Sequence, residues 1–426
     1  MKKEIDIILE NASQVLTLDP SSSGQCESDQ EARELGVIPN GAVAVGGGKI
    51  LDVGSNERIR ESYRAKERID ASGCIVTPGL VDPHTHLVFA GSRHLEFGLR
   101  MRGATYHEIL EAAGGIHATV QSTRDASLDV LVDLARPRLE NLLRFGVTTA
   151  EVKSGYGLDR ETELKMLQAI RILDRKQPVR LVATYLGAHV VPLEYRDKRD
   201  TYLDIIILEM IPEVARQGLA DAVDVFLDEG AFTKDEARAV LLAAKENGLK
   251  LKIHAGQFTD QGGPELIAEL GGLSADHLEV ISDKGIEAMA EAGVVANLLP
   301  GAAFSLRDHF PSGRRLVDGG VEVALATDDN PGTSRTENLP LMAAMGVTQM
   351  GLTVAEAWRG ITTSAAKALG MQGEVGAIIP GMRGDLAIFS VPDFRAFVYH
   401  FGHNHTEAVI ADGQIIVSRK PTHAEY

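Results

Sequence analysis

Apolar, strand-like runs alternate with helix-like segments from about residue 76 to residue 326. Several of these runs are apolar throughout, which is typical of parallel strands that are covered on both faces. Eight β/α units over about 250 residues predict an α/β fold, a TIM-like (β/α)8 barrel. A doubly wound open sheet is the alternative that this pattern leaves open. After an opening strand near His84, the expected strands are 146–152, 179–185, 222–227, 249–253, 273–277, 294–299 and 321–326.

Short β segments rich in β-branched residues lie at both ends of the chain. We expect them to pair into one small β-sandwich-like domain, formed by residues 1–75 and 374–426. The barrel, residues 76–373, is then inserted into this composite domain. The polar stretch 20–36 is expected to be an exposed loop, and 354–369 a helix. The terminal strands are expected at 5–9, 15–18, 42–45, 50–53, 385–390, 407–411 and 414–418.

The formal net charge of −17 disfavours nucleic acid and anionic membranes as partners. No apolar run approaches the roughly 18–20 residues of a membrane span, and the first residues do not form a signal peptide. Cys26 and Cys74 give no disulfide framework. We therefore expect a cytoplasmic protein whose partner is a small-molecule substrate.

Two histidines separated by one residue follow the first barrel strand, in Pro83-His84-Thr85-His86. Alternate residues of a strand point to the same side, so both imidazoles aim one way. The fifth run leads to His254, the sixth ends at His277, and the eighth leads to Asp328. Catalytic groups of a TIM barrel lie where its strands end, so these side chains are expected to meet.

Three imidazoles and one carboxylate suit zinc, and iron (Fe2+ or Fe3+) also accepts such ligands. We predict that His84, His86, His254 and Asp328 hold the metal, and that His277 is a general base. His277 and Asp328 are thus the predicted catalytic residues. Taken singly, each His could be a hydrogen-bonded rim residue, and Asp328 could cap the turn that follows it. The similar pair His403 and His405 lies in the tail, where we expect surface or interface residues.

This combination resembles the amidohydrolase superfamily, metal-dependent barrels that hydrolyse amides, lactams and amidines. Some members hold two metals that are bridged by a carbamylated lysine of the fourth strand. The fourth run here ends in Asp228-Glu229 without a lysine, and the nearby Lys153 follows the second strand. We therefore infer one divalent metal per chain.

Within the superfamily the chain closely resembles the imidazolonepropionase family of histidine degradation, over nearly its whole length. That resemblance implies hydrolysis of the ring amide of 4-imidazolone-5-propanoate to N-formimidoyl-L-glutamate, and it suggests a homodimer. Arg93 suits the substrate propionate because its planar fork binds a carboxylate through two hydrogen bonds. The other implied substrate-binding residues are Tyr156, His189, Gln257, Asn330, Gly332 and Thr333. The motifs that carry the resemblance are 84–93, 114–116, 153–158, 186–189, 299–302 and 327–333.

One segment departs from the family pattern. Related sequences often carry an acidic residue shortly after the fifth-strand histidine, where this chain has Gly256-Gln257. Neither residue transfers a proton, although the Gln257 amide can orient substrate. We therefore expect acid–base work to concentrate on His277. The alternatives are a deaminase or related hydrolase acting on another small heterocycle, and an inactive barrel that binds a ligand.

Overall fold

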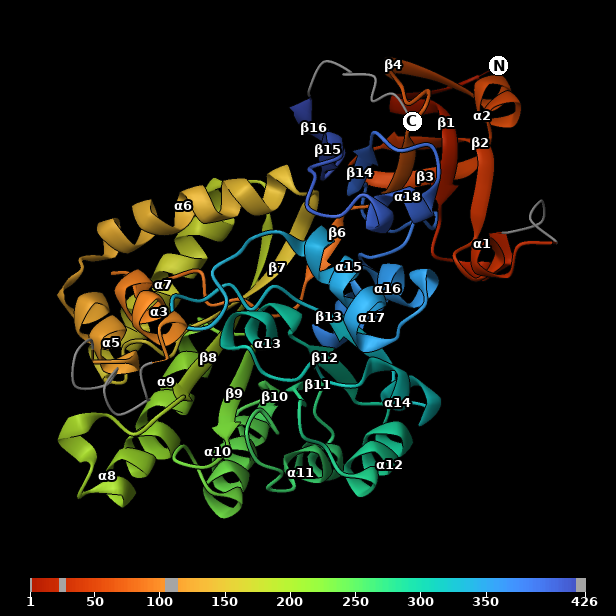
Figure 1. Cartoon of the computed structure of the whole chain (residues 1–426). Coiled ribbons are helices and arrows are strands. Elements are labelled where there is room, and N and C mark those ends of the chain that lie inside the picture. Colours follow the sequence, from red (N-terminus) through yellow and green to blue (C-terminus); the bar gives the residue numbers. More distant parts are fainter. Residues whose placement is uncertain (1, 23–27, 104–113, 419–426) are drawn as a thin grey trace.

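A computed structural model describes residues 2–22, 28–103 and 114–418. Eight strands form one sheet in which every neighbour in space is also the neighbour in sequence, and all pairs are parallel. Figure 1 shows these strands surrounded by helices. The order is β6 (Leu80–Asp82), β7 (Val147–Lys153), β8 (Arg180–Ala188), β9 (Ala222–Leu227), β10 (Lys250–Ala255), β11 (Ser274–His277), β12 (Val295–Leu298) and β13 (Val323–Leu325).

The sheet closes between the segments that follow its first and last strands. The backbone N–H of Asp328 donates to the carbonyl of His84 at 3.0 Å, and that of His86 donates to Asp329 at 2.9 Å. Thr85 and Asp329 form a parallel bridge at this seam. The (β/α)8 barrel is therefore confirmed, and the open doubly wound sheet is wrong.

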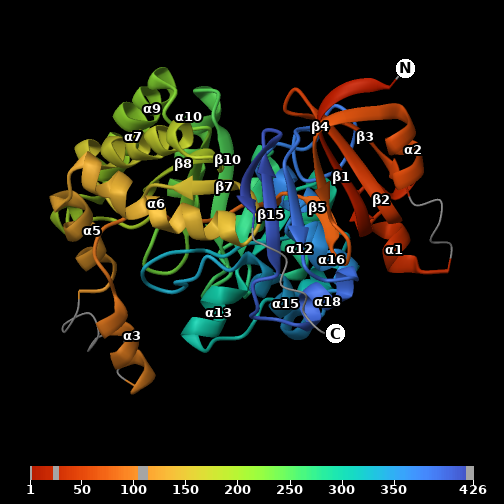
Figure 2. The same cartoon turned by 90° about the horizontal axis from the view of Figure 1, so that it is seen from above.

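Helices cover the outside of the barrel (Figure 2). Their ends carry ordinary stop and start signals: α12 (Asp283–Ala292) begins after the cap Ser282 and ends at the left-handed Gly293. None of the described helices is long and apolar enough to cross a membrane. The others along the barrel are α3 (His94–Met101), α5 (Ile116–Asp125), α6 (Leu128–Arg144), α7 (Arg160–Lys176), α8 (Arg199–Asp204), α9 (Ile211–Gln217), α10 (Lys234–Glu246), α11 (Gly263–Leu270), α13 (Pro300–Leu306), α14 (Gly313–Asp318) and α15 (Leu339–Met350).

The single helix expected at 354–369 is wrong, because the structure has two: α16 (Val354–Gly360) and α17 (Thr363–Ala368). Thr362 between them is not helical, with φ −138° and ψ −94°. Its hydroxyl donates to the carbonyl of Trp358 at 2.5 Å, which satisfies a group at the end of α16. The chain turns here while its apolar residues stay buried.

A second eight-stranded sheet combines both ends of the chain (Figure 2). The strands expected at 5–9 and 15–18 are one strand, β1, whose register shifts between Leu9 and Ala12. The composite domain's boundaries stay a prediction, although β5 joins this sheet directly to β6. The strands are β1 (Lys3–Leu16), β2 (Val37–Gly46), β3 (Lys49–Ser55), β4 (Tyr63–Asp70), β5 (Ile75–Pro78), β14 (Leu386–Phe389), β15 (Thr406–Ala411) and β16 (Gln414–Ser418).

The stretch 20–36 is more structured than the exposed loop that its composition predicts, although 23–27 lies outside the described residues. It contains α1 (Gln30–Glu34), which begins at the cap Asp29. Ala32 and Leu35 are buried. The Glu31 carboxylate accepts the backbone N–H of Ala355, so α1 is attached to the start of α16. Two apolar side chains that find a packing partner thus turn a polar stretch into a helix.

Candidate metal centre and active site

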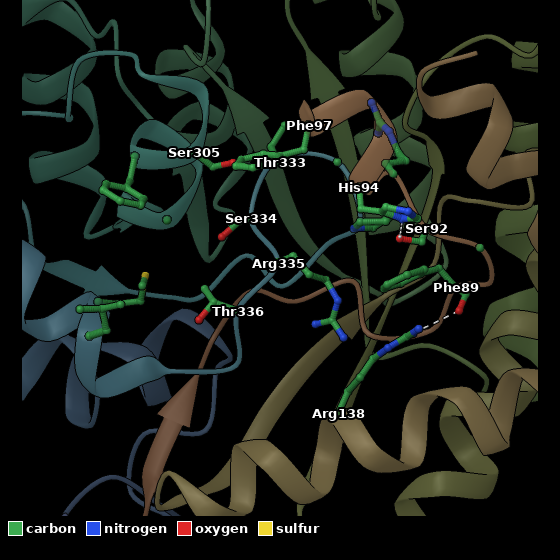
Figure 3. A pocket seen from close by; sticks show the side chains of 18 of the residues that line it. Phe89, Ser92, His94, Phe97, Arg138, Ser305, Thr333, Ser334, Arg335 and Thr336 are labelled. Atoms are coloured by element: carbon green, nitrogen blue, oxygen red, sulfur yellow. Dashed lines mark hydrogen bonds between the residues drawn. The ribbon is translucent and has the colours of Figure 1, made fainter. Parts of the chain in front are cut away.

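A cavity of about 590 Å³ lies among the loops that follow β6, β12 and β13, at the carboxyl end of the barrel strands. Figure 3 shows Arg335 and Arg138 beside Phe89 at this cavity. Arg138 donates to the carbonyl of Phe89 at 3.1 Å, and its guanidinium lies 3.6 Å from the Phe89 ring centre. The cavity therefore combines an apolar wall with positive charge. It includes three residues of the predicted substrate set: Arg93, Gly332 and Thr333.

His84, His86 and Asp328 meet at the barrel mouth. The Nε2 atoms of the two histidines are 3.2 Å apart, and they lie 3.4 and 3.6 Å from Oδ1 of Asp328. Ligand atoms about 2.0–2.2 Å from a tetrahedral metal are separated by about 3.3–3.6 Å. The three side chains therefore fit a divalent metal in spacing and in donor type. All three are also buried.

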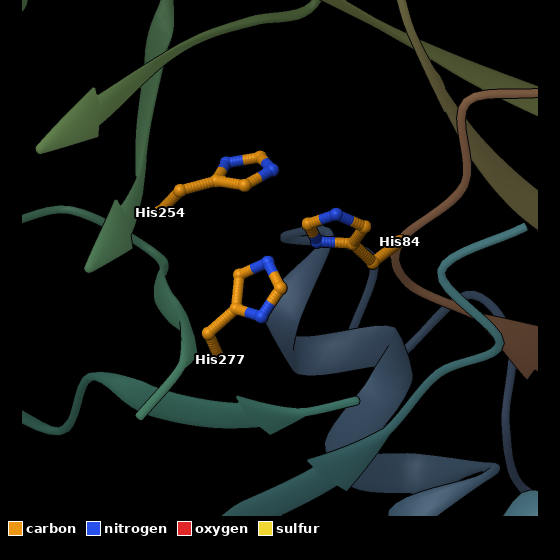
Figure 4. Close-up of side chains that lie close together, drawn as sticks. All are labelled: His84, His254 and His277. Carbon is orange, nitrogen blue, oxygen red and sulfur yellow. The ribbon is translucent and has the colours of Figure 1, made fainter. Parts of the chain in front are cut away.

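His254 and His277 complete a ring of imidazoles around His84. Figure 4 shows the three rings converging, with one ring nitrogen of His277 turned toward the other two. The ring centres of His254 and His277 lie 4.6 and 6.0 Å from that of His84. Nε2 of His254 is buried and has no hydrogen-bond partner among the described residues. The structure thus brings all five predicted metal and catalytic side chains together.

Buried carboxylates lie beside the far nitrogen of two of these histidines, and Asp276 forms a hydrogen bond with His84. Oδ2 of Asp276 lies 2.6 Å from Nδ1 of His84, and Oδ2 of Asp224 lies 3.0 Å from Nδ1 of His254. A carboxylate on Nδ1 places the proton there and leaves Nε2 free as a ligand. Burial and nearby cationic groups lower the pKa of His84 and His86, so both rings are neutral, as metal ligands must be.

The carboxylates in turn surround two buried lysines. Nζ of Lys153 lies 2.7 Å from Asp224 and 2.8 Å from Glu151, and Lys252 also binds Glu151, at 2.9 Å. Burial opposes the charge of Lys153, but Asp224, Glu151 and Asp276 outweigh it and raise its pKa. An ammonium held in this way does not form a carbamate.

The backbone is strained at two of the converging residues. His277 and Asp328 have φ values of 85° and 51°. Residues other than glycine rarely adopt such positive φ values. Burial disfavours protonation of His277, but Glu279, Asp328 and Asp276 outweigh it and raise its pKa. Burial also raises the pKa of Asp328, to about 7, in the absence of a cation. A bound cation would favour the ionised form of Asp328.

Tyr156 and His189 lie beside the histidine cluster. Their ring centres are 5.7 and 5.5 Å from that of His86, and 5.4 Å from each other. Burial and the nearby His254 lower the pKa of His189 to about 3, so its ring is neutral. Its Nδ1 lies 3.0 Å from the carbonyl of Gly155 and donates to it, which leaves Nε2 to accept a hydrogen bond from a ligand.

Arg93 is not free. Its Nε donates to Glu96 at 2.8 Å and its Nη2 binds the other oxygen of the same buried carboxylate. Arg93 thus forms a salt bridge with Glu96, but Nη1 is not part of it. A Cβ at Gly332 would lie 2.2 Å from this Nη1, so only glycine leaves room for the guanidinium edge. The role of Arg93 in substrate binding stays a prediction.

Asn330, Gly332 and Thr333 form a loop that is held mainly by its own contacts. Oδ1 of Asn330 accepts the backbone N–H of Gly332 and of Thr333, each at 2.8 Å. Nδ2 of Asn330 donates to the carbonyl of Asp328 at 2.8 Å. These N–H groups are therefore occupied, and the predicted substrate contacts of this loop stay untested. What the loop does in the structure is to fix the residues that follow Asp328.

Within the segment Gly256-Gln257, the structure requires glycine at position 256. Gly256 has φ 66°, and a Cβ there would lie 2.5 Å from the carbonyl oxygen of Val280. Gln257 is buried, and the following N–H of Phe258 donates to Asp228.

In the tail of the chain, His403 is exposed as expected, whereas His405 is buried with Nε2 bonded to the carbonyl of His400. The surface expectation is therefore wrong for His405.

Sequence reasoning missed the buried charges beneath the histidines. A signal was present, because each of these residues interrupts a strand run that is otherwise apolar. The outer side of the barrel strands packs against apolar helix faces, where an unpaired charge is unfavourable. An acid or lysine within such a run is therefore expected to face the barrel interior. Glu279, just after His277, was also missed. The missed interior residues are Glu151, Asp224, Lys252 and Asp276.

The family model described as "Amidohydrolase family" matches residues 75–416, so the chain belongs to this family. An imidazolonepropionase of Geobacillus sp. strain WCH70 is 47% identical over 96% of this chain and 98% of its own length. One from Myxococcus xanthus is 46% identical over 98% of both chains. These relatives place the chain within the family of the imidazolonepropionases.

Solved structures share the fold at lower identity. An adenosine deaminase from Xanthomonas campestris with bound zinc has a TM-score of 0.75 and 17% identity, covering 98% of this chain and 94% of its own. A mutant of atrazine chlorohydrolase from Arthrobacter aurescens, complexed with zinc and atraton, has a TM-score of 0.74 and 18% identity, covering 98% and 97%. At these identities the likeness shows the fold alone.

Proposed function

We propose that this chain hydrolyses the ring amide of 4-imidazolone-5-propanoate to N-formimidoyl-L-glutamate, a step of histidine degradation. The observation that carries the proposal is its similarity to imidazolonepropionases, at 41–47% identity over nearly the full length. The converging histidines and Asp328 supply the groups that hydrolysis of an amide needs. A deaminase has only the fold likeness in its favour.

His84, His86, His254 and Asp328 are the proposed ligands of one metal, either zinc or iron. When bound, such a metal supplies Lewis acidity: it acidifies a water molecule and polarises the ring carbonyl of the substrate. The buried carboxylates Asp224 and Asp276 support the assignment, because ligating histidines are usually oriented in this way. Nitrogen and oxygen ligands accept both metals, so metal analysis has to decide between them.

His277 is the proposed general base. Its ring nitrogen that faces His84 and His254 takes the proton of the attacking water. The same nitrogen then gives this proton to the ring nitrogen of the substrate as the carbon–nitrogen bond breaks. One proton is thus taken up and released in each turnover, and His277 ends in its starting state.

The substrate is held by groups around the histidine cluster. Burial keeps the Tyr156 hydroxyl protonated by raising its pKa, so it can donate to a substrate oxygen. The neutral His189 can accept a substrate N–H at Nε2. Arg93 can offer Nη1 to the propionate while Nε and Nη2 stay on Glu96. Gln257, Asn330, Gly332 and Thr333 complete the proposed substrate set.

The direct test is an assay of the purified protein on 4-imidazolone-5-propanoate. The loss of the ultraviolet absorbance of this substrate measures turnover. Metal quantitation of the same sample gives the identity of the metal and the number bound per chain. Removal by a chelator should abolish turnover, and re-addition of zinc or iron should restore it. No turnover by metal-loaded protein would contradict the proposed substrate.

We also propose a homodimer located in the cytoplasm. The surface that suits a second copy is an apolar groove lined by Phe304, Phe310, Leu341, Met345 and Phe401. Phe304 and Phe401 are each about two-thirds exposed. Light scattering of wild type and of Phe401→Ser tests this, because a dimer that uses the groove should dissociate in the variant.

A further inference from the structure

The loop after β11 approaches the loop after β10 closely. The N–H of Val280 donates to the carbonyl of Gly256 at 2.8 Å, and that of Leu278 donates to Ala255 at 3.1 Å. This approach needs the missing side chain of Gly256, whose Cβ would meet the carbonyl of Val280. These hydrogen bonds join the two loops, and Glu279 lies in the middle of the paired segment.

The Glu279 side chain is buried next to His277. Only 4% of it is exposed, and Oε1 lies 3.5 Å from Nδ1 of His277. Within the described parts of the chain, Oε2 of Glu279 and Nδ1 of His277 each lack a hydrogen-bond partner. A buried carboxylate that makes no other contact with a cation is costly, so its place beside an imidazole calls for an explanation.

We propose that Glu279 is a positioning residue for the proton transfer by His277: it accepts the Nδ1–H of the ring. This inference rests on the proposed function of the same site. The hydrogen bond fixes the tautomer with the proton on Nδ1, which leaves the nitrogen facing the metal site free to take a proton. A gap of 3.5 Å shortens by a small change of side-chain torsion, and catalytic hydrogen bonds often tighten when substrate binds.

Glu279 thereby supplies the carboxylate that is absent after His254. The segment Gly256-Gln257 cannot provide one, and glycine at 256 is required by the approach of the neighbouring loop. The acid that we propose to act with His277 therefore lies on the loop after β11 and not on the loop after β10. Because it lies behind His277 and not beside the substrate, it acts through the imidazole.

The proton balance is complete with these two residues. Water loses a proton to the unprotonated nitrogen of His277, and its hydroxide oxygen forms a bond to the ring carbonyl carbon. The imidazolium that results is stabilised by the Glu279 carboxylate. The carbon–nitrogen bond then breaks, and the leaving ring nitrogen takes the proton from His277.

The test compares zinc-loaded wild type with Glu279→Gln, which has the same shape but no charge. We expect kcat to fall by between about 10² and 10⁴, the range for positioned proton transfer, with KM and bound zinc unchanged. Glu279→Asp keeps the charge and should lose less. Glu287→Gln, on the exposed face of α12, is the matched control and should behave as wild type.

A second readout does not depend on turnover. Nitrogen-15 NMR of histidine-labelled, zinc-loaded protein should show His277 with its proton on Nδ1, a signal identified by its loss in His277→Asn. In Glu279→Gln, or in Glu279→Asp if the first variant does not fold, this signal should shift. An unchanged signal overturns the proposal, whatever the rate. If wild type does not hydrolyse imidazolonepropanoate, the proposed function fails, and the NMR comparison still decides the role of Glu279.

Discussion

Asp276 and His84 form a fully buried pair in which Oδ2 of the carboxylate lies 2.6 Å from Nδ1 of the imidazole. The same oxygen lies 3.4 Å from Nζ of Lys153. Asp276 therefore joins the proposed metal ligands to the charges in the barrel interior. The histidine cannot turn without disturbing that interior.

Asp276→Asn should weaken metal binding by about 10- to 100-fold, because the neutral amide no longer holds the proton on Nδ1 of His84. Competition with a chromophoric chelator measures the dissociation constant for zinc. Asp283→Asn changes the same group on the surface, where 95% of the side chain is exposed, and should leave zinc affinity unaltered. Equal affinity in wild type and Asp276→Asn would show that His84 is oriented by something else.

Lys153→Met should destabilise the fold by about 3–5 kcal/mol, because it leaves Glu151, Asp224 and Asp276 without their shared cation. The midpoint of urea unfolding reports the change. Lys284→Met, at an exposed position of α12, should unfold at the wild-type concentration. A Lys153→Met protein as stable as wild type would mean that the carboxylates take up protons at little cost.

Gly256→Ala should lower both stability and kcat, since the new Cβ would lie 2.5 Å from the carbonyl oxygen of Val280 and push away the loop that carries Glu279. Gly293→Ala is a close control, because Gly293 has a similar φ of 69° but nothing within 4 Å of a Cβ. That control should cost only the left-handed strain, about 1 kcal/mol, with kcat retained. Thermal melting and steady-state kinetics separate the two effects.

Glu163→Ala should raise KM, because this buried carboxylate accepts the backbone N–H groups of Gly155, Gly157 and Leu158 and so fixes the loop around Tyr156. Several lost charge-assisted bonds are worth at least about 3 kcal/mol together, so stability should fall as well. Glu161→Ala, on the exposed side of α7, supplies the comparison. An unaltered KM would remove Tyr156 from the proposed substrate contacts.

Glu10→Gln should reduce stability at neutral pH by at most about 1 kcal/mol. The guanidinium of Arg68, and then that of Arg60, hold the pKa of Glu10 below its ordinary value of 4.5. The contribution is therefore complete above that value and disappears as the pH falls through the lowered pKa. Urea unfolding of both proteins from pH 7 to pH 4 should show the difference becoming smaller. A difference in stability between the two proteins that grows toward pH 4 would contradict the prediction.

The convergence of His84, His86, His254 and Asp328 was predictable because all four follow apolar runs, and the barrel brings strand ends together. The partners of these four side chains were not predictable. An aspartate such as Asp276 within a run shows that the position tolerates a charge, but not which histidine it meets. That depends on the register between neighbouring strands, which the sequence does not display.

Arg93 illustrates a different limit. Its residue type predicts that it binds the substrate propionate through two bonds, and this stays a prediction; in the structure its partner is Glu96, one helical turn away. Local pairs compete with ligands for the same groups, and their outcome depends on burial. The break of the helix at Thr362 was not predictable either; there the Thr362 hydroxyl donates to the carbonyl of the buried Trp358.

The seam between β6 and β13 has a consequence for how the enzyme is assembled. The backbone groups that close the ring belong to His84, His86, Asp328 and Asp329. Of the proposed ligands, His84 and His86 come from one end of the barrel sequence and Asp328 from the other, so they meet only when the last strand docks against the first. A ring that opens at this point loses the proposed site in the same event, so binding of the proposed metal requires a complete barrel.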